Sequence, residues 1–469
     1  MADTETPQPL TLTTEIPPVV ARLRSTFDSG RTKPISWRRA QLRALRRMLT
    51  EERPTWEKAL KDDLGKPALE AHTTEIGYVV NEIDHTLKHL ASWLRPKRVG
   101  VPMSLAPAKA RWVREPLGTV LIISPWNYPV NLALAPLVGA IAAGNTAVLK
   151  PSELSPATSR VMTDLLPRYL DTEAVAVVEG GVPESTALLE ERFDHIFYTG
   201  NSAVARIVMA AAVKHLTPVT LELGGKSPAV VEPGVDLATT ARRLAWGKFT
   251  NAGQTCVAPD YVLAIGDTAQ GLQRELAAAI TEMFGSDPQA SPDYGRIVNE
   301  RHFDRLSALL DSGEVVAGGR GERESLYMEP TVLGGVDPDS PVMAEEIFGP
   351  ILPVITVPDL DAAIRFVKER DKPLALYGFT DSEATKRRLI TETSSGGVGF
   401  GLPIAHLAVP DLPFGGVGES GMGAYHAEAS IDTFSHVKPV LDKSLALDTM
   451  RMAYAPISQF KEKVIRRIS

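Results

Sequence analysis

One cysteine and one distant carboxylate are the residues of this 469-residue chain whose types suggest covalent chemistry. Cys256, the only cysteine, lies among small and polar residues at positions 251–259, and Glu222 lies upstream in a glycine-rich segment at positions 221–228. A thiolate is a strong nucleophile, and a carboxylate can act as its base or can activate a water molecule. The alternative is that Cys256 fills space in the core, since free cysteine is among the most buried residue types.

The composition is that of a soluble globular protein, with 44% hydrophobic and 23% charged residues. The formal net charge of −7 argues against nucleic-acid binding and against general adsorption to membranes. One cysteine cannot form an intramolecular disulfide, which favours a reducing, cytoplasmic location. Residues 1–18 are acidic and rich in proline and threonine, without the features of a signal peptide, so we expect a mobile tail there.

The most apolar stretch, residues 120–149, is long enough to raise the question of a transmembrane helix. Pro125, Asn127, Pro129, Pro136 and Asn145 interrupt it. The backbone groups freed at such residues would have no partner in lipid. The stretch therefore predicts a strand, a loop, a helix and a second strand, and no transmembrane segment.

The elements that must position these residues begin with helices. Residues 37–95 carry a helical pattern, since apolar side chains recur at three- and four-residue intervals through 76–94. Residues 95–113 are rich in proline and basic residues, which is typical of a linker or an exposed hairpin. Strand-like runs follow at 118–123, 146–149, 174–178, 195–198 and 219–221. Their β-branched, non-alternating character predicts a parallel sheet that is buried on both faces.

This alternation of strands and helices predicts an α/β fold whose first part is a doubly wound, Rossmann-like dinucleotide-binding domain. A second series, with strands at 261–264, 351–357 and 374–379, predicts a second doubly wound α/β domain that begins near Glu222. The glycine-rich residues 396–423 fit neither series and are interpreted as loops plus a strand. Residues 457–468 are basic and amphipathic, which predicts a solvated terminal helix with one packed apolar edge. A membrane-surface or partner helix is the alternative.

Two short patterns are similar to functional motifs but do not qualify. Residues 225–227 look like the end of a phosphate-binding loop, but Thr220 stands where that motif requires glycine, and Pro228 follows where a helix would begin. His85 and His89 are spaced to share a metal, but they lie opposite the apolar stripe, and no third ligand is near in sequence. We expect a solvated helix face there and no metal site.

Several segments then occur together in one order. They are residues 125–129, 144–153 and 197–202, the segments of Glu222 and Cys256, and residues 345–350 and 412–421. In this order and spacing they closely resemble the aldehyde dehydrogenase superfamily, and the resemblance covers about residues 34–440. Residues 198–201, 217–222 and 421–426 most resemble the class 3 branch of fatty and aromatic aldehyde dehydrogenases.

The resemblance implies a domain organisation, because members of that branch are usually homodimers with a cofactor domain, a catalytic domain and a small bridging domain. It places a dinucleotide-binding domain at 19–94 and 114–221 and a catalytic domain at 222–400. It places a β-rich bridging and oligomerisation segment at 95–113 and 401–440, and a C-terminal tail at 441–469. It also implies a homodimer and an aldehyde substrate that is aromatic or has a medium or long aliphatic chain.

The residues themselves fit the oxidation of an aldehyde to an acid. A carbonyl carbon cannot release hydride until a nucleophile adds, so a Cys256 thiolate would form a thiohemiacetal that can pass hydride to a nicotinamide. Glu222 would act as general base in hydrolysing the thioester that remains. The resemblance assigns the oxyanion donors to the side-chain amide of Asn127 and the backbone N–H of Cys256. We expect such a nucleophile to react quickly with iodoacetamide at near-neutral pH.

The resemblance also implies NAD as cofactor, with NADP as the alternative. Residues 200–205 correspond to a stretch in which a helix start meets the pyrophosphate, and Lys150 and Glu153 to contacts of the adenosine ribose. Glu153 favours NAD, because its carboxylate would repel a 2′-phosphate. Glu346 and Phe348 match residues that hold the nicotinamide ribose and pack near the nicotinamide ring. The expected cofactor contacts are Trp126, Lys150, Ser152, Glu153, Gly200, Asn201, Ser202, Ala205, Leu223, Gly224, Glu346 and Phe348.

Two residues depart from the family pattern. Ala205 stands where the final glycine of the pyrophosphate-binding stretch is usual, and we expect its methyl group to shift the helix packing or the phosphate fit. Gly401 stands where relatives usually carry asparagine, and we expect a looser loop at the substrate entrance.

Two other functions compete with the hydrolytic, NAD(P)-dependent aldehyde dehydrogenase. An acylating relative would pass the acyl group to coenzyme A, but such members commonly lack a base at the position of Glu222. A catalytically silent scaffold would keep the fold for assembly or ligand binding. Such a scaffold would have no reason to retain Cys256, Glu222, Asn127 and Lys150 together.

Overall fold

β-Branched and apolar runs in the first half of the chain form a six-stranded sheet in the computed structural model, which describes residues 11–468. The strand order is β17-β7-β6-β3-β4-β5, and all strands are parallel except β17. The strands are β3 (Thr119–Ile123), β4 (Thr146–Lys150), β5 (Val175–Val177), β6 (His195–Thr199), β7 (Val219–Glu222) and β17 (Gly421–Met422). The strands predicted between residues 118 and 221 are therefore confirmed.

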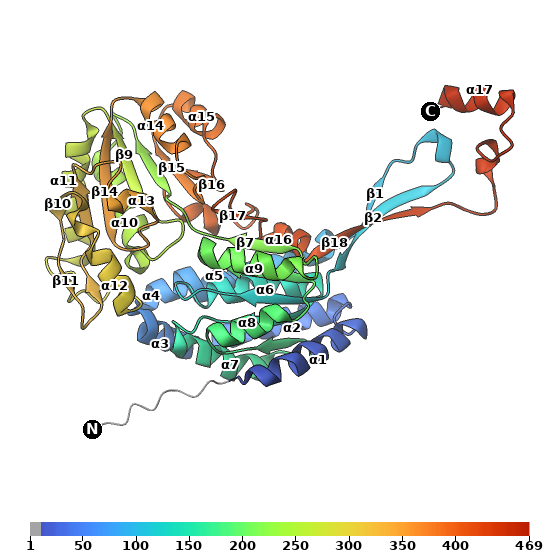
Figure 1. Ribbon diagram of the computed structural model, residues 1–469, viewed down its shortest axis with the longest axis horizontal. Coiled ribbons are helices and arrows are strands. Elements are labelled where there is room, and N and C mark those ends of the chain that lie inside the picture. Colours follow the sequence, from blue (N-terminus) through green and yellow to red (C-terminus); the bar gives the residue numbers. More distant parts are fainter. Residues whose placement is uncertain (1–10, 469) are drawn as a thin grey trace.

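Helices cover both faces of this sheet, which is why its strands lack a polar side (Figure 1). Leu121 packs on one face, whereas its neighbours Val120 and Ile122 pack on the other. The first face carries α1 (Ile16–Asp28), α8 (Val182–Glu190) and α9 (Ser202–Val213). The second face carries α2 (Ile35–Glu51), α3 (Arg53–Leu64), α5 (Gly77–Trp93), α6 (Asn131–Ala143), α7 (Pro156–Tyr169) and α16 (Ala427–Thr433). Residues 120–149 thus form the predicted strand, loop, helix and strand.

The second series of strands forms a seven-stranded sheet in the order β10-β13-β14-β9-β8-β15-β16, which is parallel except for β10. The strands are β8 (Pro228–Val231), β9 (Tyr261–Ile265), β10 (Glu314–Ala317), β13 (Thr331–Gly334), β14 (Ile351–Val357), β15 (Ala375–Phe379) and β16 (Gly397–Phe400); β11 (Gly321–Glu322) pairs separately with β12 (Tyr327–Met328). The helices are α10 (Leu237–Phe249), α11 (Thr268–Phe284), α12 (Glu300–Ser307), α13 (Pro341–Ala344), α14 (Leu360–Lys368) and α15 (Glu383–Glu392). The predicted fold class, two α/β domains with parallel sheets, is confirmed.

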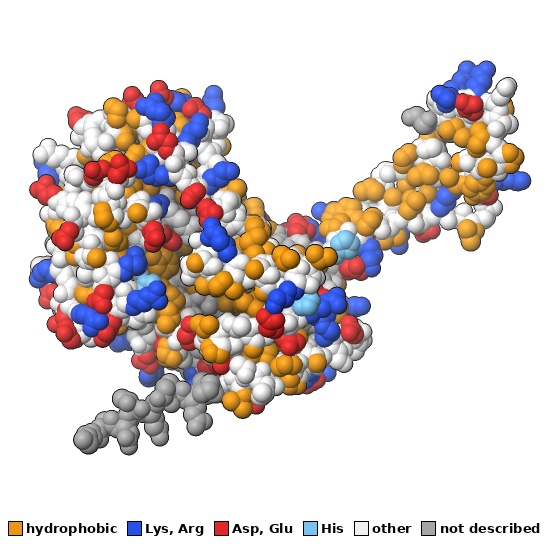
Figure 2. Space-filling view, in the orientation of Figure 1, with side chains coloured by type: hydrophobic (Ala, Val, Ile, Leu, Met, Phe, Trp, Pro, Cys, Tyr) orange, Lys and Arg blue, Asp and Glu red, His pale blue; other side chains and the backbone are white. Residues whose placement is uncertain are grey.

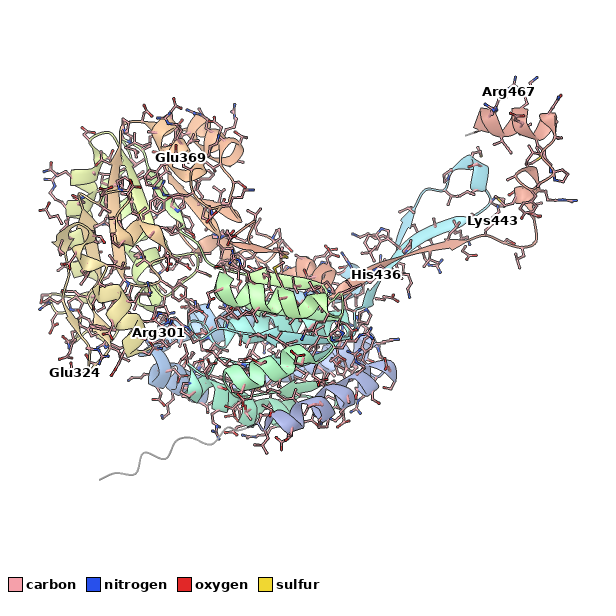
Figure 3. The ribbon with its side chains drawn as sticks, in the orientation of Figure 1. Arg301, Glu324, Glu369, His436, Lys443 and Arg467 are labelled. Carbon is pink, nitrogen blue, oxygen red and sulfur yellow. The ribbon has the colours of Figure 1, made fainter. Side chains whose placement is uncertain are left out.

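A three-stranded antiparallel arm projects from the first domain (Figure 1). It consists of β1 (Lys97–Val99), β2 (Lys109–Pro116) and β18 (Ser435–Asp442), with α17 (Gln459–Ile468) beside its tip. Figure 3 shows His436 and Lys443 along the arm and Arg467 at its far end. The bridging segment expected at 401–440 is divided, because β17 pairs with β7 and α16 packs on the first domain. Only the part that begins at Ser435 joins the arm.

The predicted N-terminal tail is partly wrong, whereas the predicted C-terminal helix is present. Of the expected N-terminal tail, residues 1–10 lie outside the described residues, but Thr13–Glu15 forms a helical turn and α1 begins at Ile16. A tail extending to residue 18 is therefore wrong, because Ile16 and Val20 are buried against the first sheet. The amphipathic C-terminal segment forms α17, on which Phe460 is 70% exposed. Within residues 11–468, no helix has the length and apolar content that crossing a bilayer requires.

The strand order creates a crevice beside β3. The chain proceeds outward from β3 through β4 to β5 and then returns to β6 on the other side of β3. Ligands of open α/β sheets bind outside the carboxyl ends of the strands at such a reversal. The expected residues after β3, β4, β6 and β7 all lie at this edge, and the segments that enter β8, β9 and β14 of the second domain approach it.

Candidate active site

The nucleophile candidate follows a sharp backbone reversal. After α10, the chain takes the left-handed conformation at Asn251 (φ 54°), Ala252 (φ 50°) and Gly253 (φ 73°). This conformation is costly for residues other than glycine and persists only where the surroundings enforce it. A side chain at Gly253 would overlap with the backbone of Gly349. Cys256 therefore stands just beyond a turn that tertiary contacts hold in a strained form.

Hydrogen bonds fix the residues on both sides of the thiol. The side chain of Gln254 donates to the carbonyl oxygens of Asn251 (3.0 Å) and Arg296 (2.9 Å) and accepts from the N–H of Val298 (2.9 Å). On the other side, the hydroxyl of Tyr377 donates to the carbonyl oxygen of Val257 (2.6 Å). The backbone of Cys256 is consequently held from its own domain before and after the thiol.

The loop after β3 reaches this turn from the first domain. Nδ2 of Asn127 donates to the carbonyl oxygen of Gln254 (3.0 Å), and Asn127 is only 2% exposed. The next residue, Tyr128, shares a 2.6 Å hydrogen bond with the hydroxyl of Thr255. The structure thus brings Asn127 next to the Cys256 segment, as expected for two donors that serve one oxyanion.

Glu222 ends β7 at the same crevice and is 2% exposed. Neither of its carboxylate oxygens has a hydrogen-bond partner among residues 11–468. Burial without a partner penalises the charged form, and the pKa of Glu222 is raised well above its usual range. The neutral form of this side chain is therefore favoured, and a polar partner or a higher pH would favour the ionised form that can act as a base.

The electrostatic fields of two acids, Glu346 and Glu222, act on the thiol of Cys256. Burial raises the pKa of the Cys256 thiol, and Glu346 and Glu222 raise it further, while hydrogen bonds from the backbone N–H groups of Cys256 and Val257 act in the opposite direction. Burial and the two acids oppose formation of the thiolate, so fast reaction of the thiol at near-neutral pH stays a prediction. The same contacts show that Cys256, Glu222 and Glu346 converge and that backbone N–H groups face the sulfur.

Glu346 enters the site on the loop before β14. A side chain at Gly224 would overlap with the Glu346 carboxylate, so the glycine provides the space that this acid occupies. Burial, followed by the charge of Asp260, raises the pKa of Glu346 to about 8, against a hydrogen bond from the N–H of Gly225. Glu346 is thus a second acid whose charge depends on its surroundings near neutral pH.

A buried ion pair anchors the loop that carries Glu346. Nζ of Lys226 lies 2.5 Å from the carboxylate of Asp260 and donates to the carbonyl oxygens of Val342 (2.9 Å) and Glu345 (2.8 Å). Asp260 in turn accepts from the N–H of Ile347 (3.0 Å). Lys226 therefore holds protein carbonyls and a carboxylate, which agrees with rejecting a phosphate-binding role for residues 225–227.

Two of the expected cofactor contacts form an aromatic pair. The ring of Trp126, after β3, meets the edge of Phe348 with centroids 5.4 Å apart, and it also lies 5.3 Å from His302. Phe348 has a left-handed backbone (φ 48°), which is unusual for a bulky residue. The structure thus brings Trp126, Phe348 and Glu346 together from two domains.

The expected adenosine contacts lie at the end of β4. Lys150 is buried, and its Nζ donates to the carbonyl oxygen of Pro151 (2.9 Å) and to Glu153 (3.3 Å). Burial lowers the pKa of Lys150, while Glu153 opposes the shift. Ser152 is also buried, whereas Glu153 is exposed. Acidic and basic groups able to bind ribose hydroxyls therefore stand side by side at this edge.

The start of α9 supplies a helix N-terminus to the same crevice. Asn201 caps the helix by accepting from the N–H of Val204 (2.9 Å), and Ser202 begins it. Gly200 precedes the cap, where a side chain would overlap with the hydroxyl of Tyr198. Unpaired N–H groups and the positive end of the helix dipole make such a terminus suited to an anion.

The two departures from the family pattern have simple structural consequences. The methyl group of Ala205 is buried in the cluster formed by α9 and the first sheet, and its N–H keeps the helical bond to Asn201 (3.1 Å). Gly401 has φ 71°, a conformation that glycine and asparagine both tolerate. Its N–H donates to Gly378 (2.8 Å), and its carbonyl oxygen accepts from Arg243 (2.8 Å). The loop at Gly401 is thus hydrogen-bonded on both sides.

The remaining expected contact, Leu223, is buried, and its N–H donates to the carbonyl oxygen of Ser420 (3.1 Å). The sequence interpretation missed Lys66, Glu75 and Asp260, which support the site through ion pairs. No local sequence pattern identifies these residues, because no recognisable motif surrounds the charged side chains that form the ion pairs. Gln254 could have been found, since it lies next but one to the nucleophile in the glycine-containing turn.

Comparisons with known proteins agree with this geometry. The model of the aldehyde dehydrogenase family matches residues 9–440. The mouse dimeric NADP-preferring aldehyde dehydrogenase is 49% identical over 443 residues, which cover 94% of this chain and 98% of that protein. The bovine aldehyde dehydrogenase family 3 member B1 is 51% identical over 420 residues, which cover 90% of each chain. The substrate-bound state of Staphylococcus aureus AldH superposes with a TM-score of 0.93 at 44% identity and covers 96% of this chain and 99% of that one.

Proposed function

Because the chain belongs to the aldehyde dehydrogenase family, we propose that it oxidises an aldehyde to the carboxylic acid with NAD(P) through a thioester on Cys256 that water hydrolyses. One observation carries the proposal. The Cys256 segment is bonded to Asn127, and the electrostatic fields of Glu222 and Glu346 both reach the thiol. These contacts support a single site for nucleophile, oxyanion donor and base, in which Asn127 and Glu222 are buried and Cys256 is partly exposed.

The first step is loss of the Cys256 thiol proton to solvent and addition of the resulting thiolate sulfur to the carbonyl carbon. The carbonyl oxygen gains a negative charge, for which the backbone N–H of Cys256 and the side-chain amide of Asn127 are the donors. The side-chain amide nitrogen of asparagine carries two hydrogens. One hydrogen of Asn127 Nδ2 is directed to the carbonyl oxygen of Gln254, which leaves the other for the oxyanion.

The residues around the crevice fit a dinucleotide. The start of α9 can receive the pyrophosphate, Lys150, Ser152 and Glu153 the adenosine ribose, and Glu346 the second ribose, with Trp126 and Phe348 beside the ring. The hydroxyl of Thr199 is buried without a partner among the described residues, which is consistent with a polar ligand at this edge. When bound, NAD(P) supplies the acceptor for the hydride that the substrate carbon loses.

Hydrolysis requires a base beside the thioester. Glu222 takes a proton from water, the water oxygen adds to the thioester carbon, and the carbon–sulfur bond breaks to release the acid and the Cys256 thiolate. The unpartnered oxygens of Glu222 suit this role because no protein group competes for them within the described chain. The same base argues against an enzyme that must protect its thioester for transfer to coenzyme A.

Substrate and assembly are proposed from the relatives. The aldehyde is aromatic or has a medium or long aliphatic chain, as in the fatty and aromatic branch to which the family 3 relatives correspond. A homodimer is supported by the word "dimeric" in the name of the mouse relative and by the apolar side chains gathered on the arm (Figure 2). We also infer a cytoplasmic location, because a single cysteine suits a reducing compartment.

The proposal is tested by following NAD(P)H absorbance with a panel of aliphatic and aromatic aldehydes, with and without coenzyme A. We expect turnover without coenzyme A and its loss in Cys256→Ala. Turnover that requires coenzyme A would assign the acylating reaction instead. A folded protein that turns over no pair of aldehyde and cofactor would contradict the enzymatic function.

A further inference from the structure

A short helical segment of the first domain lies beneath the loop that carries Asn127. It runs through α4 (Ala68–Ala71) and a π-helical turn, His72–Ile76, into α5. π-Helical turns are rare and are frequent at functional sites, because they displace one side chain from the regular helical positions. Here the turn contains Glu75, whose side chain is fully buried.

Glu75 forms an ion pair with Lys66, which precedes the same segment. Nζ of Lys66 lies 2.6 Å from Oε1 of Glu75, and neither side chain is exposed to solvent. The other oxygen, Oε2, accepts hydrogen bonds from the N–H groups of Val130 (2.9 Å) and Asn131 (3.0 Å) at the start of α6. Burial raises the pKa of Glu75, whereas the ammonium group of Lys66, these N–H groups and the helix dipole favour the carboxylate form.

Lys66 also contacts the oxyanion loop directly. Its Nζ donates to the carbonyl oxygen of Asn127 (3.1 Å) and lies 4.2 Å from the centre of the Tyr128 ring. The side chain of Asn251 donates to the same Asn127 carbonyl (2.8 Å). Lys66 and Glu75 together therefore bind the loop at Asn127 and at the start of α6, on either side of Tyr128.

The Lys66–Glu75 ion pair is placed to orient Asn127 rather than to react with a substrate. Its two charges satisfy each other and the loop backbone, and the reacting groups lie on the far side of Asn127. Because the carbonyl and the side chain of Asn127 share one Cα, a shift at the carbonyl also moves the amide. Displacement of a catalytic group by about 1 Å can slow a reaction by about 100-fold.

We propose that the Lys66–Glu75 ion pair is the positioning element that sets the Asn127 amide for the oxyanion formed at Cys256. The inference rests on the proposed function, since it requires Asn127 to be the oxyanion donor. It assigns Lys66 and Glu75 no contact with aldehyde or cofactor. Their effect on catalysis must therefore pass through Asn127.

A double-mutant cycle in the full-length protein tests this route, with the best aldehyde of the panel and saturating NAD(P). We expect Lys66→Met to lower kcat by about 10- to 100-fold with little change in KM, because only stabilisation of the transition state is lost. In the Asn127→Ala background, the same substitution should change kcat by less than about 2-fold. Lys58→Met, which removes an exposed ion pair with Asp62 in α3, is the control and should match the wild type.

The outcomes separate the inference from the function on which it rests. An Asn127→Ala protein with wild-type kcat would remove the proposed role of Asn127. A loss in Asn127→Ala without a loss in Lys66→Met would overturn the positioning role alone. Equal losses from Lys66→Met in both backgrounds would also overturn it, since a general structural effect does not depend on Asn127.

A charge-neutral pair keeps the test decisive if Lys66→Met does not fold, because a lone buried charge is strongly destabilising. Lys66→Met/Glu75→Gln removes both charges of the pair and retains an oxygen for the N–H groups of Val130 and Asn131. Circular dichroism and thermal unfolding establish that it folds. We expect the same loss in kcat, because the Asn127 carbonyl loses Lys66 and keeps only Asn251 as a donor, and a wild-type kcat would overturn the inference.

Discussion

Nδ2 of Asn127 lies 3.0 Å from the backbone oxygen of Gln254, so an amide from the first domain is bonded to the turn that carries the thiol of the second. The neighbouring bond between Tyr128 and Thr255 repeats this connection at 2.6 Å. The proposed oxyanion site is therefore complete only when both domains are correctly placed. Preorganised donors of this kind are usually the largest contribution to catalysis of acyl transfer.

The first prediction concerns Glu222 and pH. Because burial raises the pKa of Glu222, the ionised base is scarce at low pH and becomes more abundant as the pH rises. We expect kcat to increase with pH up to that raised pKa. Glu222→Gln should lose about 100-fold or more in kcat and show no such rise. Steady-state kinetics across the pH range measures both effects, and an unchanged pH profile in the variant would exclude Glu222 as the titrating group.

The second prediction concerns the reactivity of the thiol in the ligand-free protein. Burial and the nearby acids raise the pKa of Cys256, so alkylation by iodoacetamide should be slow at neutral pH and accelerate as the pH rises. Glu346 has a pKa of about 8 and is therefore mainly charged above that pH. Glu346→Gln should lower the thiol pKa and increase alkylation most clearly at alkaline pH.

Mass spectrometry of the alkylated protein is the appropriate measurement, because Cys256 is the only cysteine. Glu324→Gln is a suitable control, since Glu324 is an exposed acid of the second domain (Figure 3). Fast labelling at pH 7 in the ligand-free wild type would show that the acids do not suppress the thiolate.

The third prediction concerns the ion pair that anchors the Glu346 loop. The side chains of Lys226 and Asp260 are 12% and 4% exposed, so removing the lysine leaves a buried carboxylate whose remaining cation, Lys248, lies 4.0 Å away. We expect Lys226→Met to reduce the free energy of unfolding by about 3–5 kcal/mol. Lys386→Met, which breaks an exposed pair with Glu383, should cost at most about 1 kcal/mol.

Urea denaturation provides the midpoints and slopes for this comparison. Lys226→Met should also raise the KM for NAD(P), because the carbonyl oxygen of Glu345 loses its donor and Asp260, which accepts from the N–H of Ile347, loses its nearest cation. Equal midpoints for the two lysine variants would contradict the structural role of the buried pair.

The fourth prediction concerns the arm. A three-stranded sheet on its own exposes apolar groups, and Val437 and Leu441 of β18 are 45% and 56% exposed. They lie on one face of the strand, whereas Lys438 lies on the other. We expect Leu441→Asp to convert the proposed dimer to monomer in sedimentation velocity and Lys438→Ala to leave it intact. A monomeric wild type at micromolar concentration would refute the assembly.

The strands could be predicted from sequence because each buried strand is a self-contained run of apolar residues. The converging side chains of Asn127, Glu222 and Cys256 could be named because each lies in a short motif at the end of such a strand or in a glycine-containing turn. The start of α1 could not be predicted because the polar composition of residues 1–18 conceals one aliphatic side chain, Ile16, that packs on the sheet beside Val20.

The electrostatics could not be predicted in the same way. The pKa of Cys256 depends on Glu222 and Glu346, which approach it from separate segments, so its direction emerges only from the folded arrangement. The Lys66–Glu75 pair could not be predicted from sequence either, because a π-helical turn brings Glu75 to the loop before α6, which is distant in sequence. Such contacts have no periodicity that a sequence could display.

The most direct test of the central claim is to trap the acyl group on the thiol. Glu222→Gln is mixed with a good aldehyde substrate and NAD(P), quenched in acid, and measured as an intact protein and as peptides by mass spectrometry. We predict one acyl group per chain, located on Cys256, and no adduct in Glu222→Gln/Cys256→Ala. Formation of NAD(P)H at wild-type rate by Cys256→Ala, or an acyl group on any other residue, would contradict the account.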